Sequence, residues 1–528
     1  MDNKYVLALD VGTTGLRAIV YDHDLTEIAK AYRETPVILP NPGWVEQDPE
    51  MIWAKTQDVI REVLANIPPE KIVALGITNQ RAAFTIWDPK TGKSLINIIG
   101  WQDIRTAKEC EKLTKIPRYR LVRGIMRFLY IFWKNPYFYA ASKVEVTPVH
   151  ATVRTKWILD HIPEVTRQKA KKREILWGTI DTWLIWKLTE GRVHASDPSN
   201  LSTAGFLSPF NLKWLTLYTN TMKLPLEMMP SIEPTNGNFG ETKLFGGSIP
   251  IRAAVGDQQA SLFGQCCFEK GDTKCTNGTG TFVNMNTGDI ALASPHGILP
   301  LIAWQLDDAA KTTRFMLEGQ DATCGELIDW LVDGIGIVAK PSEVDELAVS
   351  VPNSNNVYMV PAFTGLRFPY WDPYARGTLV GLTRDTNKGH IMRAVLEGIG
   401  FRVQDFLSVM SSDTNIPVEH LRCDGGVSRS DCLLQFIANM TGAKVERGQS
   451  TDMSAIGAAM LAGLAVGYWK DLEELKKTWK VSSEFMPHIE PSEREEKLAR
   501  WQKAITAAMG WAIDIRSSKA PKEYSRNH

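Results

Sequence analysis

Residues 5–22 read YVLALDVGTTGLRAIVYD, and this stretch decides how the rest of the chain is interpreted. Tyr5–Leu9 is short and apolar, as a buried strand should be, and Leu16–Tyr21 resumes the same pattern. Between them, residues 10–15 (DVGTTG) are small and polar, which is typical of a tight turn. The stretch therefore predicts a β-hairpin whose turn is rich in glycine and threonine.

A similar layout occurs far along the chain. Thr273–Thr276 leads into NGTGT at residues 277–281, and Phe282–Met285 follows as a second strand. The two hairpins are too far apart for a short-period repeat. They predict two similar halves that face each other.

Strands and helices alternate around both hairpins. Further strands are predicted at Ile72–Ile77 and Ile251–Val255. Helices are predicted at Met51–Ala65, Thr179–Leu188, Gln258–Phe268, Gly389–Met410 and Leu433–Met440. This alternation indicates α/β layers in both halves. We place the boundary near residue 255, which gives domains 1–255 and 256–515 and a polar tail, 516–528, expected to be flexible.

Composition narrows the class of protein. The chain has 528 residues, with 60 Lys and Arg against 60 Asp and Glu, and 44% of its residues are hydrophobic. The length suggests two large domains, and the apolar content excludes a wholly disordered chain. The charge balance argues against a nucleic-acid partner. Seven cysteines without C-x-x-C spacing favour reduced thiols and a cytoplasmic location.

Two segments raise the question of membrane contact. Residues 453–469 carry no charge, but alanine and glycine dominate them, so we expect a closely packed helix of the core. Residues 118–134 (RYRLVRGIMRFLYIFWK) mix basic, aromatic and aliphatic residues at near-helical spacing. We expect this helix to cover the domain as part of an insert at about 110–150. A helix on a membrane surface, or one that docks a partner, is the alternative.

Both turns have the chemistry of phosphate sites. Backbone N–H groups of a glycine-rich turn can surround phosphate oxygens, and the hydroxyls of Thr13 and Thr14 add donors. Arg17 adds positive charge two residues after the turn. Asp10 could orient a water on Mg²⁺. Thr279 repeats this chemistry in the second turn.

The sequence allows two roles for the Asp257 side chain, a helix cap and a general base. It lies between a predicted strand and a predicted helix, where an Asp commonly caps the helix. It also precedes the second turn by about twenty residues, where a carboxylate could accept a proton from a substrate hydroxyl.

Arg81, Trp101 and Phe282 could form a small pocket. Taken singly, Arg81 is expected to be a salt-bridged arginine, and Trp101 and Phe282 are expected to be core aromatic residues. Together they offer aromatic faces for carbon atoms and a guanidinium for hydroxyl groups.

These motifs resemble the FGGY family of carbohydrate and polyol kinases, and within it the glycerol kinases, above all a divergent animal branch. The resemblance rests on segments that follow the family order along nearly the whole chain. They include LALDVGTTGLRAIVYD (7–22), GITNQR (76–81), GWQDIRT (100–106), GDQQASLFGQ (256–265), GTGTF (278–282) and CDGGVSRS (423–430).

The resemblance implies two actin-like (ribonuclease-H-like) ATPase domains that flank a catalytic cleft. It implies ATP-dependent phosphorylation of glycerol to glycerol 3-phosphate, with Mg²⁺ placed by Asp10, and it leaves a homodimer open. The residues implied at ATP are Thr13, Thr14, Gly15, Arg17, Thr279, Gly325, Gly426 and Ser430. Those implied at glycerol are Arg81, Trp101, Asp257, Gln258 and Phe282, with Asp257 as the base.

The sequence also departs from the family pattern. Ala82 follows the pocket arginine where glycerol kinases usually have Glu, and Asp329 and Ser430 stand where they have Gln and Asn. The pocket tyrosine could be Tyr137, or its place could be taken by Val149. These departures keep two alternatives open: a kinase for another small polyol or sugar, and a weakly active kinase fold with a regulatory role.

Overall fold

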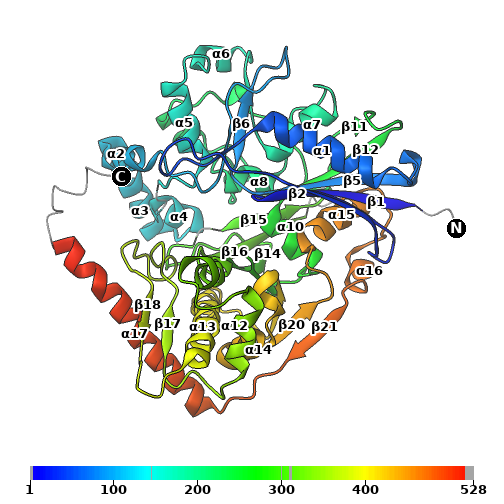
Figure 1. Ribbon diagram of the computed structural model, residues 1–528. Helices are drawn as coiled ribbons and strands as arrows, with labels where there is room; N and C mark the ends of the chain where they lie inside the picture. Colours follow the sequence, from blue (N-terminus) through cyan, green and yellow to red (C-terminus); the bar gives the residue numbers. More distant parts are fainter. Residues whose placement is uncertain (1–3, 144–145, 299, 308–311, 518–528) are drawn as a thin grey trace.

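The structure is a computed structural model that describes residues 4–143, 146–298, 300–307 and 312–517 (Figure 1). The N-terminal half contains a six-stranded sheet with the order β11-β12-β5-β1-β2-β3. Its strands are β1 (Tyr5–Val11), β2 (Gly15–Tyr21), β3 (Glu27–Glu34), β5 (Ile72–Asn79), β11 (Glu241–Thr242) and β12 (Ile249–Gly256).

The C-terminal half contains a seven-stranded sheet with the order β15-β16-β14-β13-β19-β20-β21. Its strands are β13 (Thr273–Asn277), β14 (Thr281–Gly288), β15 (Leu301–Gln305), β16 (Thr313–Asp321), β19 (His420–Asp424), β20 (Lys444–Gly448) and β21 (Val481–Phe485).

The two sheets share one pairing pattern. In the first, β1 pairs antiparallel with β2 and parallel with β5, which pairs parallel with β12. In the second, β13 pairs antiparallel with β14 and parallel with β19, which pairs parallel with β20. The predicted hairpins are therefore β1–β2 and β13–β14, at equivalent places. The prediction of two related α/β halves is confirmed.

A smaller sheet with the order β4-β7-β6-β8 extends the N-terminal half. Its strands are β4 (Glu46–Gln47), β6 (Phe84–Trp87), β7 (Ile98–Ile99) and β8 (Leu176–Thr179). Arg81 precedes β6 and Trp101 follows β7, so this sheet positions two predicted pocket residues.

The predicted helices form, with small changes at their ends. They are α1 (Pro49–Val63), α7 (Ile180–Leu188), α10 (Asp257–Gly264), α13 (Lys388–Thr414) and α14 (Asp431–Thr441). Asp48 begins α1 because its carboxylate accepts hydrogen bonds from the Glu50 and Met51 N–H groups. The predicted extension of α10 to Phe268 is wrong. Cys266 adopts a left-handed backbone with φ 51°, which a continuing helix does not allow.

Helix α15 (Met453–Ala465) joins the two halves. Although it belongs to the C-terminal part of the chain, it shares a core cluster with β1, β5 and β12 and with α10 (Figure 1). Small residues allow this approach: a Cβ on Gly457 would lie 1.8 Å from the Ala260 carbonyl oxygen. The prediction that residues 453–469 contain a closely packed core helix is confirmed. No helix in the described ranges is both long and apolar enough to cross a membrane.

The predicted insert is largely helical. It contains α2 (Ala107–Lys115), α3 (Pro117–Trp133) and α4 (Pro136–Lys143), which lie at the edge of the molecule in Figure 1. The last helix, α17 (Pro491–Ser517), enters the predicted tail, and residues 518–528 lie outside the described residues. The domain boundary near residue 255 falls where β12 meets α10, and it stays a prediction.

Candidate active site

Each of the two glycine- and threonine-rich turns is closed by a backbone hydrogen bond between two of its own glycines. In the first, the Gly12 N–H donates to the Gly15 carbonyl at 2.9 Å, and in the second the Gly278 N–H donates to the Gly280 carbonyl at 3.0 Å. Thr14 and Thr279 are exposed at the two tips. Each turn therefore presents an exposed threonine hydroxyl, which is the kind of donor that the phosphate prediction uses.

The second turn is held by the start of α11 (Gly325–Asp329). The Gly325 N–H donates to the Gly278 carbonyl at 2.9 Å, and the Cys324 N–H donates to the Thr279 carbonyl at 3.1 Å. A Cβ on Gly325 would lie 2.7 Å from the Gly278 oxygen, so only glycine fits without a shift. Gly325 thus lies against the second turn, while Asp329 is exposed at the far end of the same helix.

Asp10 and Arg17 face each other across the first hairpin. They are register partners on β1 and β2, and Arg17 Nε lies 3.3 Å from Asp10 Oδ2. Arg17 also pairs with Asp452, which Lys30 contacts through its Nζ at 2.5 Å. Burial raises the pKa of Asp10 to about 6, Arg17 opposes the shift, and the charges of Asp257 and Asp452 add to it. The carboxylate is therefore partly desolvated beside the phosphate turn.

Asp257 is the first residue of α10 and does not cap it. The N-cap is Gly256, and the Asp257 carboxylate accepts a hydrogen bond from the Gln258 N–H at 2.8 Å. Arg81 Nε lies 3.1 Å from Asp257 Oδ1. Burial raises the pKa of Asp257, and Arg81 opposes that shift. A carboxylate whose pKa is raised by burial, yet which is still partly open to solvent, suits a general base.

Glu318 joins Arg81 and Asp257 in a polar cluster, and its place there was not predicted from the sequence. Its carboxylate accepts hydrogen bonds from Arg81 Nη2 at 3.0 Å and from the Asn284 side-chain amide at 2.8 Å, and it forms an ion pair with Arg81 Nη1 at 2.9 Å. Arg81 comes from the N-terminal half, whereas Glu318 lies on β16 of the second sheet. The guanidinium therefore links the two halves at the base of the site.

Lys274 is a second residue that the sequence did not reveal. It is fully buried on β13, and its ammonium donates to Gln258 Oε1 and, at 2.7 Å, to Thr276 Oγ1. Burial lowers its pKa, whereas Asp424, Glu318 and Asp257 oppose the shift. An ammonium can only donate, so it fixes the Gln258 amide with its oxygen toward Lys274 and its NH₂ group turned away.

The register of the second sheet explains this grouping. Lys274 pairs with Asn284, and Asn284 pairs with Glu318, so the three side chains form one row across three strands. Thr276, Phe282 and Gln320 form the next such row. Because side chains alternate along a strand, the two rows share one face of the sheet, and Phe282 is placed beside the polar cluster.

Trp101 connects the predicted pocket with the first turn. Its indole N–H donates to Thr13 Oγ1 at 3.2 Å, and the Thr13 hydroxyl donates to Gln80 Oε1 at 3.1 Å. Gln80 is the neighbour of Arg81. Thr13 is thus bound to the wall of the site, which leaves Thr14 as the exposed hydroxyl of this turn. Gly15 packs beneath Tyr32, whose hydroxyl would lie 2.3 Å from a Cβ there.

The remaining two predicted ATP residues lie after β19. Gly426 is exposed and a Cβ there would meet nothing within 4 Å, so a ligand could approach its backbone. Ser430 caps α14: its hydroxyl accepts a hydrogen bond from the Leu433 N–H at 3.1 Å and donates one to the Asp345 carboxylate. Its described role is structural, and a contact with a nucleotide stays a prediction.

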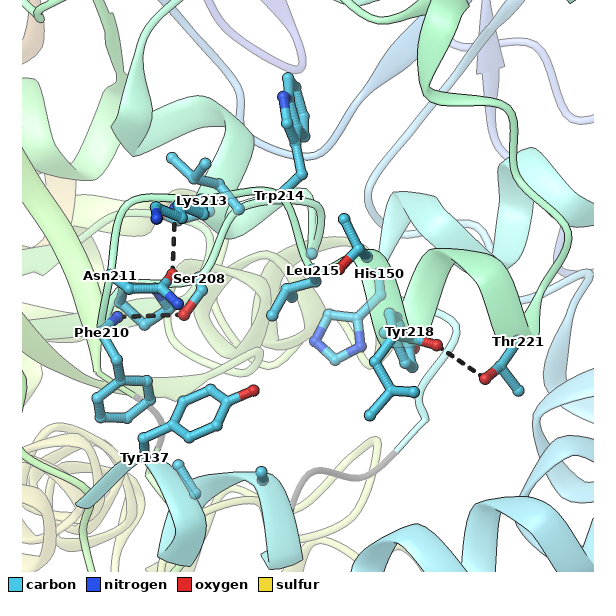
Figure 2. Close-up of a pocket in the computed structure, with 18 of the residues that line it drawn as sticks. Tyr137, His150, Ser208, Phe210, Asn211, Lys213, Trp214, Leu215, Tyr218 and Thr221 are labelled. Carbon is cyan, nitrogen blue, oxygen red and sulfur yellow. Dashed lines mark hydrogen bonds between the residues drawn. The ribbon is translucent and has the colours of Figure 1, made fainter. Parts of the chain in front are cut away.

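A large apolar cavity lies apart from this polar cluster. Its volume is about 730 Å³, and it lies between the insert and residues 202–222. Tyr137 stands on its wall beside Phe210 (Figure 2), and the centroids of the two rings are 5.7 Å apart. The structure therefore places Tyr137 among apolar groups. Val149 is connected to the residue that follows Arg81, because Arg154 donates to both the Val149 and Ala82 carbonyls.

The donor set suits a magnesium ion that keeps most of its waters. In the described part of the chain, no three His, Cys, Asp or Glu side chains form a ready-made metal site. Mg²⁺ commonly binds through one or two carboxylates together with substrate phosphates. Asp10, at the phosphate turn and near Asp257 and Asp452, offers such a carboxylate.

Comparison with known proteins shows the family of this chain. Residues 5–264 match the N-terminal domain of the FGGY family of carbohydrate kinases, and residues 273–466 match its C-terminal domain. The chain belongs to the FGGY family of carbohydrate kinases.

Several similar proteins are glycerol kinases. Glycerol kinase from Carboxydothermus hydrogenoformans is 43% identical over 97% of this chain and 100% of its own length. Glycerol kinase 2 from Thermotoga maritima is 42% identical over 96% and 99%. Among solved structures, Plasmodium falciparum glycerol kinase with ADP superposes with a TM-score of 0.86 and 29% identity, covering 96% of this chain and 98% of that one.

Proposed function

We propose that this protein is an ATP-dependent glycerol kinase, which transfers the terminal phosphoryl group of ATP to a primary hydroxyl of glycerol. Full-length similarity to glycerol kinases supports the substrate. The observation that carries the chemistry is the contact of Asp257 with Arg81, close to Asp10 of the first phosphate turn.

In this proposal Asp257 accepts the proton of the attacking hydroxyl. Arg81 and the Gln258 amide donate to the substrate hydroxyls, while Trp101 and Phe282 contact its carbon atoms. Backbone N–H groups of both turns, with the Thr14 and Thr279 hydroxyls, bind the phosphates of ATP and stabilise charge on the transferring group. Asp10 would hold Mg²⁺, which supplies positive charge beside the phosphates.

The free state of the thiols supports a reducing compartment such as the cytoplasm. All seven cysteines are buried, and each is a free thiol that forms no disulfide. A homodimer is a further prediction, which light scattering of the purified protein tests directly.

The test of the substrate is a panel of glycerol, other small polyols and ketoses, with the purified protein, ATP and Mg²⁺. We expect the highest kcat/KM for glycerol. The second candidate is a kinase for a larger polyol or sugar, which the small side chain of Ala82 favours. A ketose or longer polyol with a higher kcat/KM would establish that candidate instead.

A further inference from the structure

Helix α3 presents an apolar stripe to the outside of the molecule. Leu121, Ile125, Phe128 and Phe132 are 63%, 46%, 57% and 64% exposed. Their spacing of four, three and four residues puts them on one face of the helix. A continuous exposed stripe of large apolar residues is unusual on a folded domain and marks an interaction site.

The opposite face of α3 is already used within the protein. Val122, Arg123 and Met126 line the large cavity, and Arg123 Nε donates to the Ser142 carbonyl of α4 at 2.8 Å. The expectation that this helix covers the domain is therefore correct for one face only. The outer stripe needs a different partner.

The charges around the stripe identify the chemistry of that partner. Arg120 and Arg127 are exposed and lie along one edge of it, and Lys134 follows its end. These three cations form no ion pair with any residue that the structure describes. Between Lys112 and Lys143 the sequence contains Lys and Arg but no Asp or Glu. The region is thus strongly basic within a chain of zero net charge.

A groove on the same face combines both features. It is lined by Lys115, Pro117, Arg120, Leu121, Gly124, Ile125 and Phe128. Gly124 leaves open space in this groove, since a Cβ there would meet nothing within 4 Å. The groove therefore has an apolar floor between two cationic side chains.

We propose that α3 binds the surface of an anionic lipid bilayer, with Leu121, Ile125, Phe128 and Phe132 inserted among the acyl chains and the basic residues at the headgroups. Amphipathic helices with Lys and Arg beside a Phe- and Leu-rich face bind membranes in this way. A second copy of the same helix is disfavoured, because it would bring two basic surfaces together. The chain's own C-terminus is disfavoured for the same reason, because it is basic too, with Lys519, Lys522 and Arg526.

The test is co-sedimentation of the full-length protein with vesicles of phosphatidylcholine alone and of phosphatidylcholine mixed with phosphatidylserine. We expect binding to the mixed vesicles that weakens as salt is added, because surface charges are screened. Failure to bind mixed vesicles at low salt would overturn the proposal. Equal binding to both vesicles at all salt concentrations would also overturn it, since charge would then have no role.

Two variants probe the two features separately. Phe128→Asp with Phe132→Asp removes the apolar contact, and Arg120→Glu with Arg127→Glu reverses the charge; each pair should weaken binding at least about tenfold. Leu39→Asp and Lys340→Glu are matched controls, because both side chains are highly exposed outside the insert, and they should bind like the wild type. Kinase activity on a water-soluble substrate should not change in any of them.

Two results would assign the stripe to something else. Wild-type binding by both double variants would show that α3 is not the contact. A wild-type dimer that Phe128→Asp with Phe132→Asp converts to a monomer, with no vesicle binding by either, would make the stripe a protein interface.

Discussion

Arg81 and Asp257 lie in contact, with Arg81 Nε 3.1 Å from Asp257 Oδ1, and the same guanidinium holds Glu318 on the second sheet. Two charges therefore act on Asp257, the proposed base: the Arg81 guanidinium in contact with it, and the Glu318 carboxylate on the other side of that guanidinium. Arg81 lowers the pKa of Asp257 and Glu318 raises it, on top of the rise caused by burial. The proton affinity of the base should depend on both partners.

Replacing Glu318 with Gln should shift the pH profile of catalysis. Removing the negative charge stabilises ionised Asp257 and lowers its pKa, so the acid limb of kcat/KM should move to lower pH. The measurement is kcat/KM for glycerol across pH, with the exposed Glu419→Gln as the matched control. An acid limb that stays in place or moves to higher pH would show that Glu318 does not tune the base.

Replacing Lys274 with Met should weaken glycerol binding. The ammonium that orients the Gln258 amide is lost, so we expect KM for glycerol to rise about 10- to 100-fold while KM for ATP changes little. Steady-state kinetics on both substrates measure this, with the exposed Lys477→Met as control. If Lys274 acts through Gln258, the double variant with Gln258→Ala should be no worse than Gln258→Ala alone. Additive losses would contradict that route.

Asp10 should make the free protein less stable at neutral pH. Burial raises its pKa from the ordinary 3.8 to about 6 in the folded state, so its contribution is favourable below about pH 4 and is lost as pH rises through 6. The Asp10→Asn side chain does not ionise, so the variant does not lose stability in this way as the pH rises. Its unfolding free energy relative to wild type should increase by about 2 kcal/mol between pH 4 and pH 7. Denaturant unfolding at both pH values, without nucleotide, measures the change; a constant difference would contradict it.

Gly457→Ala should separate α10 from α15. The added Cβ would lie 1.8 Å from the Ala260 carbonyl oxygen, so one helix must move, at a cost of about 1–3 kcal/mol. Because Asp257 begins α10, kcat should fall as well. Gly124→Ala is the matched control: its Cβ meets nothing within 4 Å, and it should stabilise α3 slightly. Urea unfolding and turnover of both variants check the expectation, and unchanged stability of Gly457→Ala would contradict it.

The hairpins and most helices were predictable because their signals are local. Residues 5–21 contain two apolar runs and a glycine-rich turn, and Asp48 and Pro49 mark the start of α1. The end of α10 was less predictable. Apolar residues continue to Phe268, and only the left-handed backbone at Cys266 ends the helix.

The candidate site divides in the same way. Asp10 lies near the end of a buried strand, Arg81 and Asp257 come after one, and these positions made them candidates. Glu318 and Lys274 lie within strands, where a single charged residue usually faces solvent. The predicted hairpin already pairs Lys274 with Asn284, but only the register between β14 and β16 adds Glu318, and that pairing is not encoded in any local pattern.

The most direct test of the proposed mechanism is the turnover of Asp257→Asn, with Asp385→Asn as an exposed control. Asn preserves the shape of Asp257 but cannot accept the hydroxyl proton. We expect glycerol-dependent ADP formation to fall roughly 10²- to 10⁴-fold, with the melting temperature and ATP binding close to those of the wild type. Turnover near the wild-type rate by the folded Asp257→Asn protein would contradict the assignment of Asp257 as the base.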